Sequence, residues 1–190
     1  MKVTDLIAKI LKENNIKNVF GLQGGAVVHI FDSLEKKNVN VTYNHHEQSA
    51  ALAAVANAKV TNNIGCAVVT TGPGTTNAIT GLLASWQDSV PCIFISGQAR
   101  SNHVSYGKKV RQVGTQEVNI CDIVRPITKY TKFINKKEDV EKEFKKAISI
   151  AKSGRPGPVW LDLALEIQWS NVKIDKIIAV KKNTKINKNI

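Results

Sequence analysis

Apolar, β-branched runs alternate along the chain with segments of helical periodicity, and this alternation constrains the fold more than any other feature. The clearest unit is the apolar run at residues 64–70, which leads through a glycine-rich turn into a helical pattern at 75–88. Strands that lack polar alternation are buried on both faces, and strands separated by helices form parallel sheets covered by helices. The alternation therefore predicts a doubly wound α/β fold with about six parallel strands.

The 190 residues suffice for one substantial domain, and we expect no second full domain. Residues 1–170 hold all the alternating elements and form the predicted domain, whereas residues 171–190 are rich in Lys, Asn and Ile and indicate a linker or tail. Strands are expected at residues 18–22, 39–43, 64–70, 91–96, 127–133 and 159–163, and helices at 3–14, 26–37, 48–60, 75–88, 116–124 and 136–152.

Small or acidic residues directly follow several of the predicted strands. The groups are Gly24-Gly25, Glu47, Gly72-Pro73-Gly74 and Gly97. In open α/β sheets, ligands bind at the carboxyl ends of the strands. We therefore expect these residues to gather on one edge of the sheet.

The turn at residues 71–77 brings backbone close to whatever lies at that edge. It lacks the third glycine of a dinucleotide fingerprint, since Asn77 stands there, and it lacks the Gly-Lys-Ser/Thr of a P-loop. By itself this turn is either a ligand site or a tight structural turn.

Glu47 lies where an extended segment turns into an alanine-rich helix, away from the charged surface runs. If Asn44 is the N-cap of that helix, Glu47 occupies the third helical position and completes a relative of the capping box. Otherwise the carboxylate serves chemistry. A metal site with His45 and His46 is not expected, because adjacent side chains point in different directions and no second ligand cluster occurs elsewhere.

The formal net charge of +12 raises the question of nucleic-acid binding. Residues 171–190 hold six lysines against one aspartate, and no aromatic residues are interleaved with the basic residues as a stacking platform requires. The charge therefore indicates a solvated basic surface, with no specific nucleic-acid partner.

Three cysteines, Cys66, Cys92 and Cys121, are widely spaced without a Cys-x-x-Cys pair. Their odd number and apolar surroundings predict buried, reduced thiols rather than a disulfide framework or a zinc site. No apolar run is long enough to cross a bilayer, and residues 1–5 lack a signal core. We expect a cytoplasmic protein without membrane contact.

Short motifs occur in a fixed order from residue 3 to residue 163. They are residues 19–26 (VFGLQGGA), 46–51 (HEQSAA), 71–78 (TGPGTTNA), 88–91 (DSVP), 95–98 (ISGQ), 116–118 (QEV), 125–129 (RPITK) and 154–159 (GRPGPV). In this order and spacing the sequence resembles the N-terminal pyrimidine-binding domain of thiamine diphosphate enzymes, and among them the acetolactate synthase group.

This resemblance assigns roles to residues at the predicted edge. Glu47 matches the glutamate that hydrogen-bonds N1′ of the cofactor's aminopyrimidine, which favours the 4′-imino tautomer that removes the C2 proton of the thiazolium before attack on a 2-oxo acid. Gly24 and Gly25 would admit the middle of the cofactor to the backbone. Gly72, Pro73, Gly74 and Asn77 would line the pyrimidine pocket, and Gln116 would approach the substrate.

Two departures from the family pattern lie near this expected site. Leu22-Gln23 stands where acetolactate synthases usually have Tyr-Pro, and Thr115 stands where they usually have an aromatic residue. The resemblance therefore leaves open the substrates and the choice between carboligase and decarboxylase.

The family binds the cofactor's diphosphate through Mg²⁺ on a Gly-Asp-Gly motif in a separate domain, and this chain has no Gly-Asp-Gly. The resemblance thus implies a domain that is inactive alone and needs a diphosphate-binding domain of the same or a partner chain. It also implies a homodimer that forms through the alanine-rich helix at residues 48–60. The alternatives are a noncatalytic oligomerisation or regulatory domain of the same fold and a basic nucleic-acid module.

Overall fold

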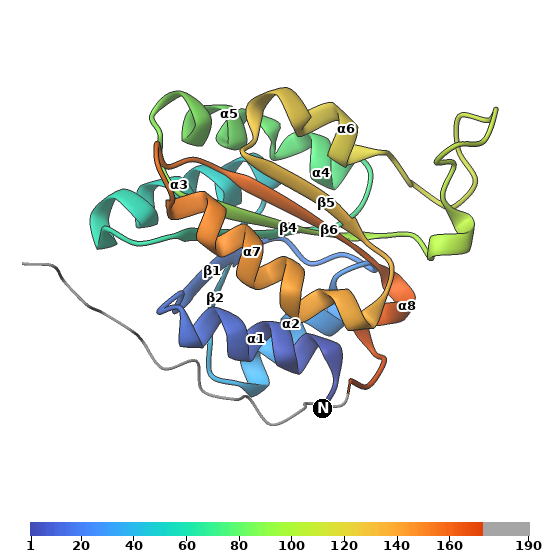
Figure 1. Cartoon of the computed structure of the whole chain (residues 1–190), viewed down its shortest axis with the longest axis horizontal. Coiled ribbons are helices and arrows are strands. Elements are labelled where there is room, and N and C mark those ends of the chain that lie inside the picture. The colour runs from blue at the N-terminus through green and yellow to red at the C-terminus, as the bar shows by residue number, and fades with distance from the viewer. Residues whose placement is uncertain (173–190) are drawn as a thin grey trace, which may run out of the picture.

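The computed structural model describes residues 1–172, which form a six-stranded sheet with helices on both faces (Figure 1). All neighbouring strands are parallel, in the order β2-β1-β3-β4-β6-β5. This architecture confirms the predicted doubly wound fold. The strands are β1 (Asn18–Gly21), β2 (Asn40–Tyr43), β3 (Gly65–Val69), β4 (Cys92–Gln98), β5 (Tyr130–Ile134) and β6 (Val159–Ala164).

The helices cover the sheet in two layers. Side chains of α1, α2 and α7 form one hydrophobic core with the sheet, and those of α3, α5 and α6 form a second core on the opposite face. The helices are α1 (Val3–Glu13), α2 (Val28–Lys36), α3 (Glu47–Thr61), α4 (Pro73–Asn77), α5 (Ile79–Gln87), α6 (Ile120–Val124), α7 (Val140–Lys152) and α8 (Leu165–Gln168), with short 3₁₀ turns at Ser101–His103, Arg125–Ile127 and Lys137–Asp139.

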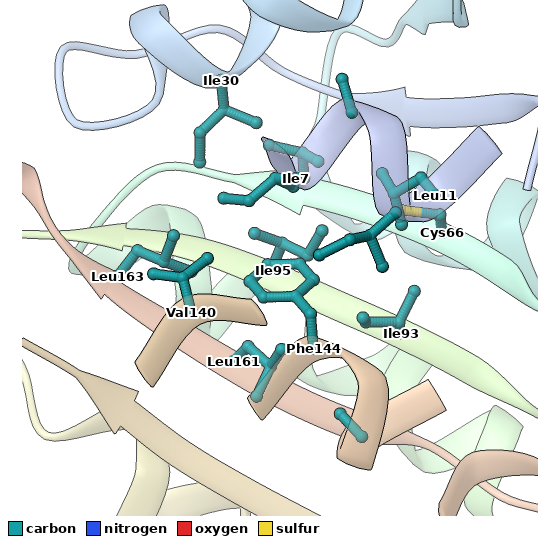
Figure 2. Close-up of a cluster of buried hydrophobic side chains, with 14 of the residues drawn as sticks. Ile7, Leu11, Ile30, Cys66, Ile93, Ile95, Val140, Phe144, Leu161 and Leu163 are labelled. Atoms are coloured by element: carbon teal, nitrogen blue, oxygen red, sulfur yellow. The ribbon is translucent and has the colours of Figure 1, made fainter. Parts of the chain in front are cut away.

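The central strands are buried on both faces, as their sequences predict. Every residue of β3, β4 and β6 is buried, because helices pack on both sides of each strand. Figure 2 shows the first core, in which Phe144 of α7 points toward Ile93, Ile95 and Leu161 of the sheet.

The chain reverses its direction of winding between β1 and β3. From β1 it passes to β2 at one edge of the sheet, then returns to place β3 on the other side of β1 and continues toward β4. Loops that follow strands on either side of such a reversal diverge to opposite faces and leave a crevice between them. The ends of β1 and β3 therefore mark the expected ligand position.

Several predicted boundaries were wrong: the helix expected at residues 116–124 begins only at Ile120, and the strand expected at residues 127–133 begins only at Tyr130. The helix expected at residues 75–88 begins earlier and is divided at Ala78 into α4 and α5. The strand expected to end at residue 96 continues through Gly97 to Gln98, so Gly97 does not terminate β4. A side chain at position 97 would collide with the carbonyl oxygen of Ala26, so the glycine lets the loop after β1 reach β4.

The two ends of the described chain lie together. Lys2 forms an antiparallel bridge with Asn171, and the amide of Val172 donates to the carbonyl of Met1. The remainder of the predicted linker, residues 173–190, lies outside the described residues. Within residues 1–172 no helix has both the length and the apolar composition needed to cross a membrane.

The three cysteines are free and buried, which confirms that prediction. Burial raises the pKa of all three thiols, for Cys92 to about 11 and for Cys121 to about 12. They are therefore protonated at neutral pH and serve as small apolar side chains.

Helix α3 packs unusually close to its neighbours because glycines face it from two sides. Gly65 of β3 lies against the backbone carbonyl of Ala54, and Gly81 of α5 lies against Ala51. A Cβ at either glycine would overlap α3. The alanine-rich sequence of α3 thus meets strand and helix backbones with almost no side chain between them.

We predict that Gly65→Ala lowers the free energy of unfolding by roughly 2–3 kcal/mol, because the added methyl group overpacks the contact between β3 and α3. Urea denaturation of the chain measures the change. The matched control is Gly25→Ala, whose added methyl group meets nothing within 4 Å and should alter stability by less than about 0.5 kcal/mol. Equal effects of the two substitutions would contradict the packing described for α3.

Candidate functional site

A cleft of about 320 Å³ opens at the carboxyl ends of the strands. Its lining includes Gly25 from the loop after β1, Thr70 from the end of β3, Gln98 from the end of β4, and Gln116 from the loop before α6. The parallel sheet brings these four segments to one edge although 91 residues separate the first from the last. The predicted gathering of strand-following residues is therefore found in the structure.

Thr70 sits between two of the predicted glycines. A Cβ at Gly24 would lie 2.5 Å from Thr70 Cβ, and a Cβ at Gly74 would lie 2.8 Å from Thr70 Cγ2. Real Cβ atoms do not approach this closely, so both positions require glycine while Thr70 keeps its place. The loops after β1 and β3 consequently meet at the point where the winding reverses.

Glu47 is the first residue of α3, which excludes the alternative in which Asn44 is the N-cap. The N-cap is His46, whose Nδ1 accepts a hydrogen bond from the amide of Gln48 at 3.1 Å, so Asn44 does not cap the helix. Glu47 therefore does not stand at the third helical position. The Glu47 side chain therefore makes no capping-box hydrogen bond, and Glu47 is only 7% exposed.

The Glu47 carboxylate is instead held from α4. Asn77 Nδ2 donates to Glu47 Oε2 at 3.0 Å across 30 residues of sequence. Among the described residues, no donor hydrogen-bonds to the second oxygen, Oε1, and a Cβ at Gly74 would lie 3.2 Å from it. One carboxylate oxygen is fixed while the other faces a position kept open by a glycine.

The predicted site residues form two neighbouring groups. Glu47 at the start of α3, Gly74 in α4 and the half-buried Asn77 at the end of α4 form one cluster, whereas Gly25 and Gln116 lie in the open cleft. The turn at residues 70–74 joins them. Three predicted residues have supporting positions: Gly24 contacts Thr70, Gly72 adopts a positive φ of 63° that favours glycine, and Pro73 starts α4 at the surface.

The neighbouring histidines do not join Glu47 in a metal site. His45 and His46 are exposed, Glu47 is buried, and His46 uses Nδ1 as the helix cap. Within residues 1–172, no group of three or more His, Cys, Asp or Glu side chains is arranged to hold a metal ion.

Sequence reasoning missed the buried polar residues beneath the cleft. Gln98 and Asp162 are fully buried, and Gln98 Nε2 donates to Asp162 Oδ2 at 2.9 Å. Ser96 Oγ donates to the other oxygen, Oδ1, at 2.6 Å. Burial raises the pKa of Asp162 to about 7, against the opposing effect of these hydrogen bonds. The signal that could have found them is a polar residue inside an apolar strand.

The geometry leaves one oxygen of the Glu47 carboxylate available to a ligand. A carboxylate with one oxygen oriented and the other accessible can share a proton with a ring nitrogen, and the backbone at Gly74 leaves space beside that oxygen. The open cleft past Gly25 and Gln116 offers room for a longer molecule to continue.

Comparison with known proteins relates the chain to one family. The family model described as "Thiamine pyrophosphate enzyme, N-terminal TPP binding domain" matches residues 1–123. The chain is similar to the acetolactate synthase large subunit of Haemophilus influenzae, with 38% identity over 170 residues that cover 89% of this chain and 29% of the relative.

Two further relatives give the same result. Identity is 37% to the acetolactate synthase isozyme 3 large subunit of Escherichia coli, over 86% of this chain and 28% of the relative. It is 35% to the probable acetolactate synthase large subunit of Methanocaldococcus jannaschii, over 93% and 29%. The chain therefore spans less than a third of the length of these relatives.

We predict that the free energy of unfolding falls as the pH rises from about 4 to about 7 and then levels off, through Asp162. The folded state binds this proton more tightly than the unfolded state, so the stabilisation is complete below the ordinary pKa and is lost as pH passes the raised one. The fall is at most about 4 kcal/mol, since one pKa unit corresponds to about 1.4 kcal/mol.

Denaturation at a series of pH values measures this slope. Asp162→Asn should remove the fall in the free energy of unfolding that is due to Asp162. The control Asp5→Asn, which changes a partly exposed carboxylate on α1, should retain that fall. A slope that is the same in Asp162→Asn and in the unaltered chain would contradict the assignment to Asp162.

Proposed function

Because the chain belongs to the thiamine pyrophosphate enzymes, as their N-terminal TPP binding domain, we propose that it forms the aminopyrimidine-binding half of an active site that acts on a 2-oxo acid. The observation that carries this proposal is the Glu47 carboxylate, with Oε2 held by Asn77 and Oε1 beside Gly74. The acetolactate synthase names of the relatives favour a carboligase that uses a 2-oxo acid such as pyruvate.

The residues present fit the aminopyrimidine of thiamine diphosphate. A Cβ at Gly74 would lie 3.2 Å from Glu47 Oε1, so glycine keeps a narrow opening next to the one carboxylate oxygen without a donor among the described residues. A flat ring with a basic nitrogen satisfies both conditions. Gly72, Pro73 and Asn77 belong to the same turn and helix and would form the wall of this pocket.

When bound, thiamine diphosphate supplies a thiazolium carbon that adds to the carbonyl of a 2-oxo acid and accepts the electrons released by decarboxylation. Glu47 would hold a proton at N1′ of the pyrimidine and thereby favour the tautomer that acts as a base. Asn77 holds Oε2 of the carboxylate, which would leave Oε1 for that nitrogen. In this proposal Gly25, which lines the cleft, would leave the backbone open to the middle of the cofactor, Gly24 would support that loop against Thr70, and Gln116 would approach the substrate.

The other half of the site would come from a different domain. The described residues offer no cluster of acidic or histidine side chains for a metal ion. We therefore propose that a diphosphate-binding domain, in the same or a partner chain, holds Mg²⁺ and the charged end of the cofactor. Without that second domain, this pyrimidine-binding domain would be inactive.

A second copy of the chain is the proposed partner at α3. The exposed side of this helix includes Ser49, Leu52, Ala56 and Val60, and Leu52 is 40% exposed. The neighbouring helix α5 exposes Leu83 and Trp86 to similar extents. Large apolar side chains exposed on two packed helices favour a protein interface. A homodimer formed there would place the start of α3, and so Glu47, close to the partner.

We predict that Glu47→Gln in the complete polypeptide lowers turnover of the 2-oxo acid by about 10²- to 10⁴-fold, because the amide cannot hold a proton at N1′. The free energy of unfolding should change by less than about 1 kcal/mol, since the amide keeps a hydrogen-bond acceptor for Asn77. Steady-state assays with thiamine diphosphate and Mg²⁺ measure the effect.

The matched control is His45→Ala, which alters an exposed neighbour outside the proposed site and should retain turnover. Near-normal turnover of Glu47→Gln would sink the proposal. Dimerisation without any binding of thiamine diphosphate in calorimetry would instead favour a noncatalytic oligomerisation domain.

We predict that Leu52→Glu raises the dissociation constant of the homodimer at least about tenfold, because it puts a charge into the proposed interface on the exposed side of α3. Analytical ultracentrifugation over a concentration series measures this constant. Val28→Glu is the matched control, since Val28 begins α2 on the opposite face of the sheet and is 45% exposed. Equal dimerisation of both variants would exclude α3 as the interface.

A further inference from the structure

We infer that Gln98 and Asp162 are positioning residues, which hold the turn after β3 and the main chain of Gln116 in place through one buried hydrogen-bond network. Neither side chain belongs to the group around Glu47. The inference rests on the proposed function for its consequence in catalysis, whereas the network itself is a property of the described structure.

The register of the sheet brings the two residues together. Ser96 pairs with Asp162 across β4 and β6, and Gln98 pairs with Ala164, two residues further along. Since alternate residues share a face, Asp162 lies beside both Ser96 and Gln98 on the α3 and α6 side of the sheet. Its two oxygens accept from these two side chains, at 2.6 Å from Ser96 Oγ and 2.9 Å from Gln98 Nε2.

These contacts allow the Gln98 amide only one orientation. Besides Asp162, the Nε2 group donates to the carbonyl of Val118 at 2.8 Å and lies 3.1 Å from the hydroxyl of Tyr106. The Val118 carbonyl can only accept, so the NH₂ group must face it. The Oε1 atom is then directed to the opposite side, where it accepts from the amide of Ala99 and the hydroxyl of Thr71.

Thr71 carries the connection to the site. Its hydroxyl lies 3.0 Å from Gln98 Oε1 and 3.3 Å from the carbonyl oxygen of Gln116. The next residue, Gly72, packs so closely on that carbonyl that a Cβ would overlap it. Both Gly72 and Gln116 have positive φ, of 63° and 58°, and Gln116 adopts this conformation without being glycine.

Two parts of the proposed site therefore depend on one buried carboxyl group. The turn that begins at Thr71 leads into α4, which carries Asn77 and so orients Glu47. The carbonyl of Gln116 belongs to the loop before α6, which lines the cleft. A rotation of the Gln98 amide would present NH₂ to the Ala99 amide and remove the acceptor from Thr71.

The groups that face Asp162 leave its charge without a cation. They are Ser96 and Gln98 of β4, Tyr106 of the loop after β4 and Cys121 of α6, with Glu117 near Tyr106. Among residues 1–172, no ion pair involves Asp162. A change in the protonation state of Asp162 should therefore change the hydrogen bonds that Ser96 and Gln98 make with it.

Nuclear magnetic resonance of the 190-residue chain without cofactor tests the network. Trp160 Nε1 donates to Ser96 Oγ at 2.9 Å, so its indole proton reports on Asp162. We expect this signal and the Gly72 amide signal to titrate together with a midpoint near pH 7. Gln98→Leu should displace the Gly72 signal and separate it from the titration of the indole.

Ser33→Ala is the matched control, because it removes another buried side-chain hydrogen bond, to Thr4, on the opposite face of the sheet. It should leave both signals in place. A Gly72 amide that responds neither to pH nor to Gln98→Leu would overturn the inference, as would a response of equal size in Ser33→Ala.

Turnover of the complete polypeptide tests the catalytic consequence. Gln98→Leu should lower kcat at least about tenfold and change KM for the 2-oxo acid less than about twofold, because misplaced groups slow the reaction step more than binding. Unchanged kcat would overturn the positioning role. Absence of cofactor-dependent turnover in the unaltered protein would refute the proposed function and leave the spectroscopic test of the network intact.

Discussion

The carboxyl edge of the sheet depends on loops that approach one another with almost no side chain between them. The loop after β1 reaches Thr70 at Gly24, and it reaches β4 where Gly97 meets the carbonyl of Ala26. The turn after β3 in turn contacts the main chain of Gln116. Because the loop backbones contact one another directly, the register of the parallel strands also determines the relative positions of the loops. Side chains from distant parts of the sequence are thereby held in fixed positions at this edge.

Much of this fold could be predicted because its signals are local. The apolar runs of β3, β4 and β6 predicted buried parallel strands, and the order of the short motifs predicted the family to which the chain belongs. The gathering of glycines and Glu47 at one edge followed from the rule that parallel strands end together. Boundaries were less accurate, since the break at Ala78 between α4 and α5 leaves no mark in helical periodicity.

What could not be predicted depends on contacts across long stretches of sequence. The hydrogen bond from Asn77 to Glu47 spans 30 residues, and that from Gln98 to Asp162 spans 64. Both require the register of the sheet, which composition and spacing do not specify. The alternative of an Asn44 cap fails for a related reason: the residue pattern at Asn44 fits a relative of the capping box, but His46, whose φ and ψ are extended, is the N-cap.

Helix α3 is packed tightly at its middle turns and carries the Glu47 carboxylate at its first residue. Gly65 and Gly81 bring β3 and α5 against its middle turns, so the helix cannot slide or rotate without moving both neighbours. Fifteen residues of helix extend about 22 Å. The position of Glu47 therefore depends on how the middle of α3 packs against β3 and α5. A displacement of α3 at these contacts would also move the Glu47 carboxylate.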